Sequence, residues 1–231
     1  MIFLFIPGVN NTASTWDPTR AALAELGYES IAVDCPAIND VAELARAIMP
    51  DDSKKYVVVG HSFGGMVALS VLDQFADRIE GIVLVNSTDG NDSAELAASR
   101  IVKAQQALDG QYLAFAAGAT SRAYHPDNLE RKELMQARET EVASYGAERF
   151  AAHQTAMSTR PNRQELFAAC GMPKLVVAAD NDVVITTAKQ KAMAEKAGAD
   201  YQEIATTGHM LPAEAPEALA QVLAQWSKAN F

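Results

Sequence analysis

The amino-acid sequence predicts an α/β protein built on a mostly parallel, doubly wound sheet. Short apolar runs recur along the 231 residues, and segments with helical periodicity separate them. The runs are rich in Val, Ile and Leu and do not alternate with polar residues, a pattern typical of strands buried on both faces. The expected strands are Ile2–Ile6, Ser30–Val33, Tyr56–Val59, Gly81–Val85, Lys174–Ala178 and Tyr201–Ile204.

The segments between these runs carry signals for the beginning and the end of helices. Asp17 and Pro18 supply a helix cap and a first-turn proline, and Gly27 supplies an ending. Asp40 and Glu43 have the spacing of a capping box at the start of the next helix. Strands that alternate with helices in this way predict right-handed crossovers within one sheet.

Composition and charge exclude several classes of function. Hydrophobic residues make up 49% of the chain, enough for a sizeable core, and the length suits a single domain over residues 1–231. The formal net charge of −10 argues against partners such as nucleic acid or anionic membranes, because both need basic side chains.

The opening MIFLFIPG reads as a strand and not as a signal peptide, so we expect a cytoplasmic protein. Cys35 and Cys170 form no CxxC pair, which argues against zinc and redox motifs.

One segment interrupts the alternation of strands and helices. From about residue 91 to residue 167 no strand-like run occurs, and the sequence is helix-forming and polar on one face. An insertion of this length in an α/β unit is usually functional. We therefore expect a helical lid inserted before the strand Lys174–Ala178; the alternative is a purely structural helical extension.

The stretch GHSFGG, residues 60–65, predicts a catalytic serine. It follows the apolar run Tyr56–Val59 and precedes an apolar helix, which is the context in which G-x-S-x-G forms a sharp turn that exposes the serine hydroxyl. This turn lies at the carboxyl end of the sheet, where ligands bind in open α/β folds. Ser62 is therefore the expected nucleophile; the alternative is a glycine-rich turn with an idle serine.

A serine nucleophile needs a base to remove its proton. Among the four histidines, His209 stands in the loop TTGHMLPAEAP between the last strand and the last helix, on the same side of the sheet as Ser62. His61 adjoins the serine but is expected to point away and to pack behind it. His125 and His153 lie in the expected lid. His209 is the predicted base.

The histidine needs an acid, which should follow a strand between the serine and the histidine in the chain. The stretch KLVVAADNDVV offers Asp180 and Asp182. Asp182 lies further beyond the strand and is preferred, while Asp180 is suited to hold the turn through its own backbone bonds. Asp89, after the preceding strand, is the third candidate.

An oxyanion hole needs backbone N–H groups that point at the developing charge. One is expected from Phe63, the residue after the nucleophile. The other should come from the loop after the first strand, IPGVNNTASTW, where Pro7 has no N–H. Val9 is the predicted second donor, and Asn10 is the alternative.

With these residues in place, the chain resembles the α/β-hydrolase superfamily, and most of all its small lidded carboxylesterases and lactonases. The resemblance covers nearly the whole chain and rests on IPGV, VDCP, GHSFGGMVA, AADNDVV and GHMLPAEAPE, which occur in family order. It implies a Ser62–Asp182–His209 triad, an oxyanion hole at Val9 and Phe63, no metal and no cofactor. Pro7-Gly8 replaces the usual His-Gly, and Ala179 replaces the usual Gly of the acid loop.

The resemblance implies a serine hydrolase that cleaves a small carboxylic ester or lactone through an acyl-enzyme on Ser62. Relatives use the same frame as carbon–carbon bond hydrolases, hydroxynitrile lyases, perhydrolases or ligand receptors, which are the alternatives. The expected partner is therefore a small-molecule ester or lactone, and the protein is a monomer or a homodimer. Candidate substrate contacts, each with ordinary packing or solvation as its alternative, are Asn10, Trp16, Met66, Tyr124 and Arg160, with Arg163 beside the last.

Overall fold

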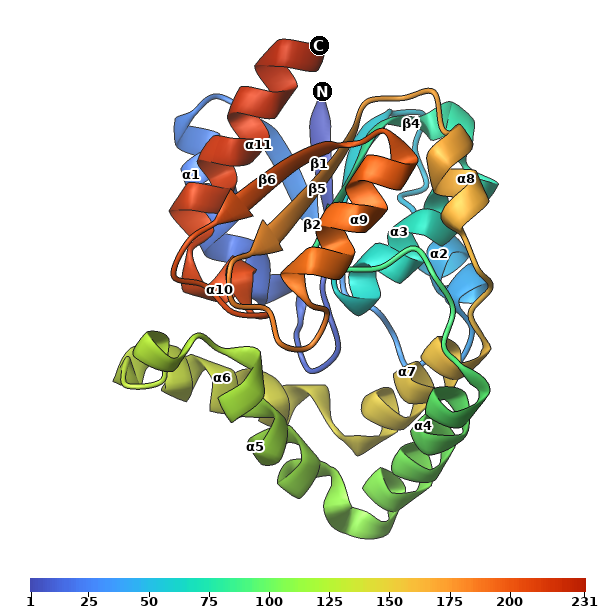
Figure 1. Ribbon diagram of the computed structural model, residues 1–231, viewed down its shortest axis with the longest axis vertical. Coiled ribbons are helices and arrows are strands. Elements are labelled where there is room, and N and C mark those ends of the chain that lie inside the picture. Colours follow the sequence, from blue (N-terminus) through green and yellow to red (C-terminus); the bar gives the residue numbers. More distant parts are fainter.

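A parallel sheet of six strands forms the centre of the protein in a computed structural model that describes residues 1–231 (Figure 1). The strand order is β2-β1-β3-β4-β5-β6, and every neighbouring pair is parallel. This confirms the predicted α/β fold with a doubly wound sheet. The strands are β1 (Ile2–Ile6), β2 (Glu29–Ala32), β3 (Tyr56–His61), β4 (Ile79–Val85), β5 (Lys174–Ala179) and β6 (Asp200–Ile204).

The order of the strands locates the crevice of the sheet. The chain moves outward from β1 to β2, returns across β1 to form β3, and then adds β4, β5 and β6 in turn. The winding therefore reverses between β1 and β3, and open α/β sheets bind ligands beyond the carboxyl ends of the strands at such a reversal. The loop after β1 and the turn after β3 are the two segments that meet there.

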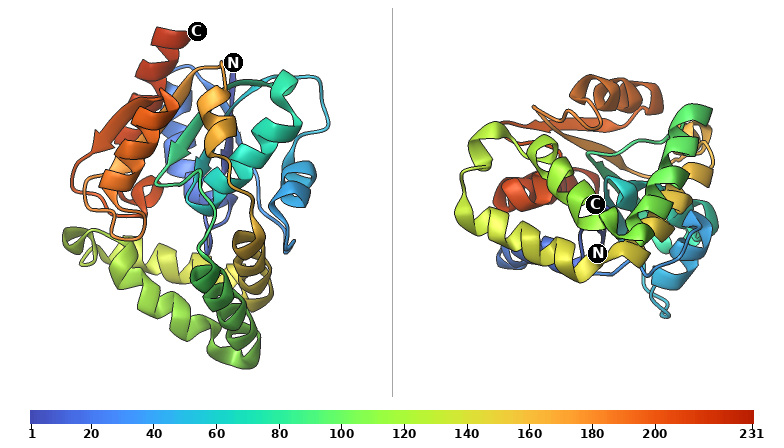
Figure 2. Two further views of the ribbon diagram at one scale, coloured as in Figure 1. Left: turned by 45° about the vertical axis from the view of Figure 1, so that its right-hand side comes forward. Right: turned by 90° about the horizontal axis from the view of Figure 1, so that it is seen from below.

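Helices cover both faces of the sheet, as Figures 1 and 2 show. One face packs against α1 (Asp17–Glu25) and α11 (Pro216–Asn230) through a core of 18 buried residues. The other face packs against a core of 26 buried residues with several helices above it. Those helices are α2 (Val41–Ile48), α3 (Phe63–Gln74), α8 (Gln164–Ala169) and α9 (Thr187–Ala197). Every residue of the central strand β3 is buried, as its unbroken apolar run predicted.

The two predicted helix caps behave differently. The Asp40 carboxylate accepts hydrogen bonds from the backbone N–H groups of Ala42 and Glu43, both at 2.8 Å, and so caps α2. Asp17 does not cap α1, because a short helical turn, Ala13–Trp16, runs directly into it and makes Asp17 its first residue. Gly27, at φ 85°, ends α1 in the backbone conformation that favours glycine.

Four longer helices project beyond the carboxyl ends of the strands and form a separate layer in Figures 1 and 2. We call residues 94–159 the helical insertion. It holds α4 (Ala94–Gln106), a π-helical turn (Ala107–Gln111), α5 (Tyr112–Ala123), α6 (Lys132–Tyr145) and α7 (Ala147–Thr159). It has a small apolar core of its own.

The remaining short elements are the turns Ala76–Arg78 and Pro126–Asn128 and helix α10 (Leu211–Glu214). No helix combines the length and hydropathy that crossing a membrane requires.

Candidate active site

The turn between β3 and α3 holds Ser62 in a conformation that few side chains adopt. Its φ and ψ are 52° and −117°, outside the regions that L residues favour. Such a residue costs about 1–3 kcal/mol and persists only where its surroundings hold it. The Ser62 N–H donates to the Val85 carbonyl at 2.9 Å, and the Ser62 carbonyl accepts from the Ser87 hydroxyl at 2.6 Å. These bonds anchor the turn to the end of β4.

The glycines around Ser62 are required by close packing of the backbone. A Cβ atom on Gly60 would overlap the Gly64 carbonyl, and one on Gly64 would overlap the Ile6 carbonyl at the end of β1. A Cβ on Gly65 would overlap the Ser87 side chain. The start of α3 can therefore approach β1 and β4 only without these side chains. This close approach explains why a buried strand ends in GHSFGG.

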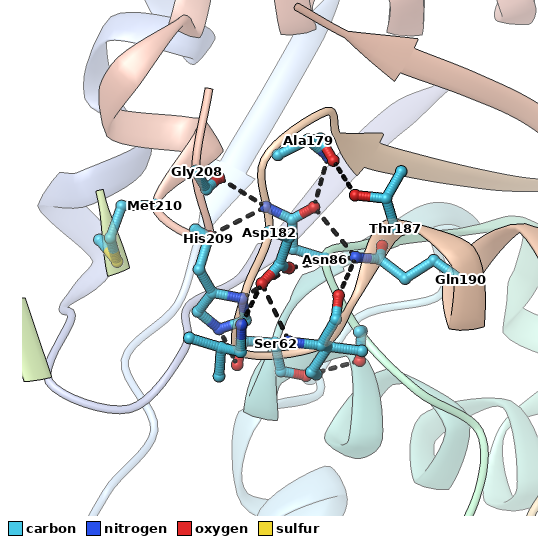
Figure 3. Close-up of polar contacts among 12 residues, drawn as sticks. Ser62, Asn86, Ala179, Asp182, Thr187, Gln190, Gly208, His209 and Met210 are labelled. Carbon is cyan, nitrogen blue, oxygen red and sulfur yellow. Dashed lines mark hydrogen bonds and ion pairs between the residues drawn. The ribbon is translucent and has the colours of Figure 1, made fainter. Parts of the chain in front are cut away.

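The three side chains predicted to act together lie in one hydrogen-bonded row (Figure 3). The Ser62 Oγ is 2.9 Å from His209 Nε2. On the other side of the imidazole, His209 Nδ1 is 2.8 Å from Asp182 Oδ2. The three residues come from separate loops, after β3, β5 and β6, all at the carboxyl edge of the sheet. A row of this kind can pass the hydroxyl proton to the imidazole and orient the resulting cation.

Hydrogen bonds to both of its oxygens hold the Asp182 side chain in place. Its Oδ1 accepts from the backbone N–H groups of Val184 and Ile185 at 2.8 and 2.9 Å. Its Oδ2 accepts from Gln190 Nε2 at 3.1 Å in addition to the contact with His209. Only 3% of Asp182 is exposed, so its charge is compensated by these donors and not by water.

The other two candidate acids lie elsewhere. Asp180 is exposed and accepts from the backbone N–H groups of Thr206 and Thr207 at 2.9 and 3.1 Å, so it ties the loop after β6 to the loop after β5. These bonds reach another loop, so Asp180 does not hold its own turn as its position suggested; the local bonds of that turn go to Asp182 instead. Asp89 lies after β4 beside Arg160 and does not contact His209, and burial raises the pKa of its carboxyl.

Three side chains hold the backbone of the His209 loop through hydrogen bonds. Two of them, Asn86 and Glu214, were not singled out from the sequence, and the third, His61, was given only a packing role. The His209 carbonyl accepts from His61 Nε2 at 2.7 Å and from Asn86 Nδ2 at 3.0 Å. Burial lowers the pKa of His61 to about 3, so its ring is neutral and donates from Nε2. The Glu214 carboxylate accepts from the Gly208 N–H at 2.9 Å. A polar Asn directly after a buried strand was the available signal for Asn86.

The loop after β1 faces Ser62 across the crevice. Val9 and Asn10 line the cavity in front of Ser62, and Asn10 has a positive φ of 61°. The Asn10 carbonyl accepts from Arg138 Nη1 at 2.7 Å, which ties this loop to α6 of the helical insertion. Phe63, the first residue of α3, follows Ser62 directly, so its N–H belongs to the helix N-terminus. Of the two predicted oxyanion donors, Val9 therefore lines the same cavity as Ser62, and Phe63 follows Ser62 in the chain.

A cavity of about 650 Å³ opens in front of Ser62 and His209. The sheet edge forms its floor, and α4, α5 and α7 supply much of its wall. Among the predicted substrate contacts, Asn10, Met66 and Arg160 line this cavity.

Another hollow of about 650 Å³ lies at the amino ends of β1, β2 and β3, far from these residues in the fold. No group of three or more His, Cys, Asp or Glu side chains is arranged to hold a metal ion.

Two predicted substrate contacts do not line the cavity, because other contacts bury them. Trp16 is fully buried and packs on Phe5, with ring centroids 4.6 Å apart, in the core that faces α1 and α11. Tyr124 clusters with Ala123 and Met210, and burial raises its pKa to about 12. The neighbouring alternative Arg163 also stays outside, paired with Asp73 on α3 at 2.8 Å.

The end of α5 is joined to the His209 loop. The Met210 N–H donates to the Ala123 carbonyl at 2.9 Å, and the His125 N–H donates to the Glu214 carboxylate at 2.8 Å. Gly208 lies against the backbone of Tyr124 and His125, and a Cβ there would come within 2.6 Å of the His125 nitrogen. The helical insertion therefore supports the segment that carries the histidine.

Comparison with known proteins gives consistent matches. The chain superposes on a malate-bound thermophilic esterase from Thermogutta terrifontis with a TM-score of 0.92 and 22% identity, covering 99% of this chain and 90% of that one. It superposes on the enol-lactonase from Burkholderia xenovorans LB400 with a TM-score of 0.85 and 21% identity, covering 98% and 91%. These likenesses show the fold.

A sequence match reaches RutD of Variovorax paradoxus, which is named as a carbamate hydrolase. It is 31% identical over 98 residues, which are 36% of this chain and 37% of that protein, so the chain spans little more than a third of this curated relative. The family model of the alpha/beta hydrolase family matches residues 3–222. From this match over nearly the whole chain, together with the sheet and the turn after β3, we conclude that the protein belongs to the alpha/beta hydrolase family.

Proposed function

We propose that the protein is a serine hydrolase that cleaves a small carboxylic ester or lactone through an acyl-enzyme on Ser62. The observation that carries this proposal is the row of contacts from Ser62 Oγ to His209 Nε2, at 2.9 Å, and from His209 Nδ1 to Asp182 Oδ2, at 2.8 Å. The serine end of this row opens into the cavity. A nucleophile, its base and the orienting acid are thus within hydrogen-bond reach of one another and of a substrate.

In the first step, Ser62 Oγ attacks the carbonyl carbon while His209 Nε2 takes the hydroxyl proton. Asp182 keeps the Nδ1–H tautomer of the imidazole and stabilises the imidazolium that forms. The negative charge moves to the carbonyl oxygen of the tetrahedral intermediate. His209 then donates its proton to the leaving alkoxide, the carbon–oxygen bond breaks, and the acyl group stays on Ser62.

The N–H groups of Phe63 and Val9 are the donors for the negatively charged oxygen in this proposal. The Phe63 N–H lies at the N-terminus of α3, where the helix dipole also favours a negative charge. Each such donor is worth about 2.7–4 kcal/mol in the transition state. In the second half of the reaction, water gives a proton to His209 and attacks the acyl carbon. His209 then returns this proton to Ser62 Oγ as the bond between Oγ and the acyl carbon breaks, which releases the acid and the free Ser62 hydroxyl.

The helical insertion serves as the lid of this site in the proposal. Residues of α5 line the cavity opposite Ser62, among them Ala114, Phe115 and Gly118. Apolar contacts there shield the acyl-enzyme and its oxyanion from bulk water, which strengthens the electrostatic interactions in the site. Among the similar proteins, one is named an esterase, one an enol-lactonase and one a carbamate hydrolase. All three names describe attack on an acyl carbon, which makes esters and lactones the first substrates to test.

Intact-mass spectrometry after treatment with a fluorophosphonate tests the proposal, with 4-nitrophenyl acetate hydrolysis measured in parallel. We expect one adduct on the wild type, none on Ser62→Ala, and a matching loss of hydrolysis of about 10⁶-fold in that variant. Ser158→Ala, on α7, is the matched control and should keep both signals.

An adduct that persists in Ser62→Ala would contradict the assignment of the nucleophile. A folded wild type with neither adduct nor hydrolysis would favour a small-ligand receptor of the same fold. Labelling of Ser62 without turnover of any ester or lactone would instead direct the search to carbon–carbon bond cleavage, cyanide addition or peracid formation.

A further inference from the structure

The cavity in front of Ser62 carries a charge opposite to that of the whole protein. The chain has a formal net charge of −10. The side chains that line the cavity nevertheless include six basic residues and one acidic residue. The basic residues are Arg100, Lys103, Arg122, Arg138, Arg160 and Lys189, and the acidic residue is Asp92. The positive charge is therefore concentrated where a substrate would bind.

Two of the six basic residues share a single carboxylate. Asp92 pairs with Arg160, Oδ1 to Nη2 at 2.7 Å, and with Arg100, Oδ2 to Nε at 2.5 Å. This cluster ties α4 to the end of α7 and carries one net positive charge. Lys103, Arg122, Arg138 and Lys189 form no ion pair with any carboxylate of the protein.

Arg138 is the most unusual of these four, because it is only 5% exposed. Its Nη1 donates to two neutral acceptors, the Asn10 carbonyl at 2.7 Å and Asn11 Oδ1 at 3.1 Å. Its Nε is buried and has no partner at all. Burial lowers the pKa of Arg138, which reflects the cost of keeping this cation away from water. A buried charge of this kind normally has a counter-ion.

We propose that the substrate carries a carboxylate in addition to its ester or lactone group, and that Arg138 is the residue that binds this carboxylate. The proposal rests on the serine-hydrolase function proposed above and specifies its substrate class. Arg138 borders the cavity that holds Ser62, next to Asn10 of the loop after β1. Lys103, Arg122 and Lys189 are exposed at the cavity wall and attract the anion from solution.

A carboxylate suits this site better than a larger anion. Nη1 of Arg138 is occupied by the loop after β1, so only part of the guanidinium fork remains for a ligand. Two carboxylate oxygens match that remainder, whereas a phosphate dianion brings three oxygens and a second charge. The lysines and Arg122 on the exposed wall provide attraction at longer range.

The test compares esters that differ only in charge. Mono(4-nitrophenyl) adipate carries a carboxylate on the acyl side, and 4-nitrophenyl methyl adipate is its neutral equivalent. The pair 4-acetoxybenzoate and methyl 4-acetoxybenzoate places the charge on the leaving group instead. Each kcat/KM is divided by the rate constant for hydroxide hydrolysis, so that intrinsic reactivity cancels. We expect the wild type to favour the anionic ester of at least one pair by about 10- to 100-fold.

Variants assign this preference to residues. Arg138→Gln should reduce the anionic-to-neutral ratio about tenfold or more, and Arg138→Lys should retain part of it. Because Arg138 also holds the loop after β1, the ratio is the readout and not the absolute rate. Lys103→Gln, Arg122→Gln and Lys189→Gln change exposed residues that should not impair folding, and each should lower the ratio about 2- to 5-fold, less at high salt. Arg46→Gln, an exposed residue of α2, removes the same charge elsewhere and should leave the ratio unchanged.

The outcomes separate this inference from the proposed function. Hydrolysis of the neutral esters with anionic-to-neutral ratios near one in both pairs would overturn the inference and leave the serine hydrolase intact. A preference that survives Arg138→Gln would overturn the assignment of Arg138. Calorimetric titration of Ser62→Ala with the two adipate esters is independent of turnover. Tighter binding of the anionic ester there would support the inference even if no ester were hydrolysed, while equal binding would contradict it.

Discussion

The floor and the wall of the cavity are built in opposite ways. The floor, at the carboxyl edge of the sheet, places Ser62, His209 and Asp182 on short loops that buried hydrogen bonds to the backbone hold in place. The wall comes largely from the helical insertion, where exposed apolar side chains such as Leu96 line the cavity together with basic ones. The floor can therefore define a reaction, while the wall can change its choice of substrate without disturbing the sheet.

The largest expected effect concerns two neighbouring carboxylates of the floor. Asp182→Asn should lower kcat by about 10⁴-fold on a neutral ester, because the amide no longer stabilises the His209 imidazolium or its tautomer. Asp180→Asn, two residues away, should change kcat less than about tenfold, because that carboxylate bonds only backbone N–H groups. Steady-state kinetics on both purified variants measures the difference. Equal losses would mean that the acid has been assigned to the wrong residue.

A second prediction compares glycines of the floor and the wall through stability. Gly64→Ala should destabilise the protein by about 3 kcal/mol or more, because the new methyl group would overlap the Ile6 carbonyl, which cannot move alone. Gly118→Ala, in α5, should stabilise the protein by about 0.5–1 kcal/mol, since nothing lies within 4 Å of the new atom. Urea unfolding of both variants at pH 7 provides the two values. A tolerated Gly64→Ala would show that the approach of α3 to β1 is not tight.

A third prediction is a loss of stability in acid that both regions share. Burial lowers the pKa of His61, in the floor, to about 3 and that of His153, in the wall, to about 4. Each histidine is therefore neutral in the folded protein, while the unfolded chain takes up a proton below about pH 6.5. Between pH 7 and pH 5 each should cost about 2 kcal/mol of unfolding free energy.

The variant His153→Gln isolates the contribution of the wall. It should lower the unfolding free energy at pH 7 and reduce the further loss on acidification to pH 5 by about half. Urea titrations of the variant and the wild type at the two pH values measure this change. An unchanged dependence on pH would show that His153 is protonated in the folded state.

The sheet and the relative placement of the three floor residues could be predicted because they depend on local signals. Apolar runs marked the inner strands, while the edge strands β2 (ESIA) and β6 (DYQEI) are more polar and partly exposed. A parallel sheet brings the carboxyl ends of all its strands to one edge. Ser62 follows β3 directly and His209 lies in the loop after β6, so their approach was a consequence of topology. The distance from the end of β5 distinguished the two aspartates. Asp180 follows the strand directly, whereas Asp182 lies two residues further along the loop, where it can reach His209.

Contacts that depend on how helices pack could not be predicted in this way. Trp16 was expected near the substrate, but it packs on Phe5 in the core that also includes residues of α11. Because α11 lies about 200 residues further along the chain, no local pattern around Trp16 indicates this contact. Arg138 lies in a helix rich in charged residues, and only its burial against the loop after β1 distinguishes it. Asp17 does not cap α1 because the preceding turn, Ala13–Trp16, runs directly into the helix.

The hydrogen bond between the Met210 N–H and the Ala123 carbonyl has a practical consequence for engineering. Residues 123–128 of the insertion form hydrogen bonds with Met210 and Glu214, which follow His209 in the chain. Residues of α4 and of α5 before Ala123 line the cavity. When the insertion is exchanged between homologous proteins, residues 123–128 of the protein that receives the graft should therefore be kept. A graft that ends before Ala123 can bring new specificity, while one that extends past Asn128 would also have to bring its own histidine loop.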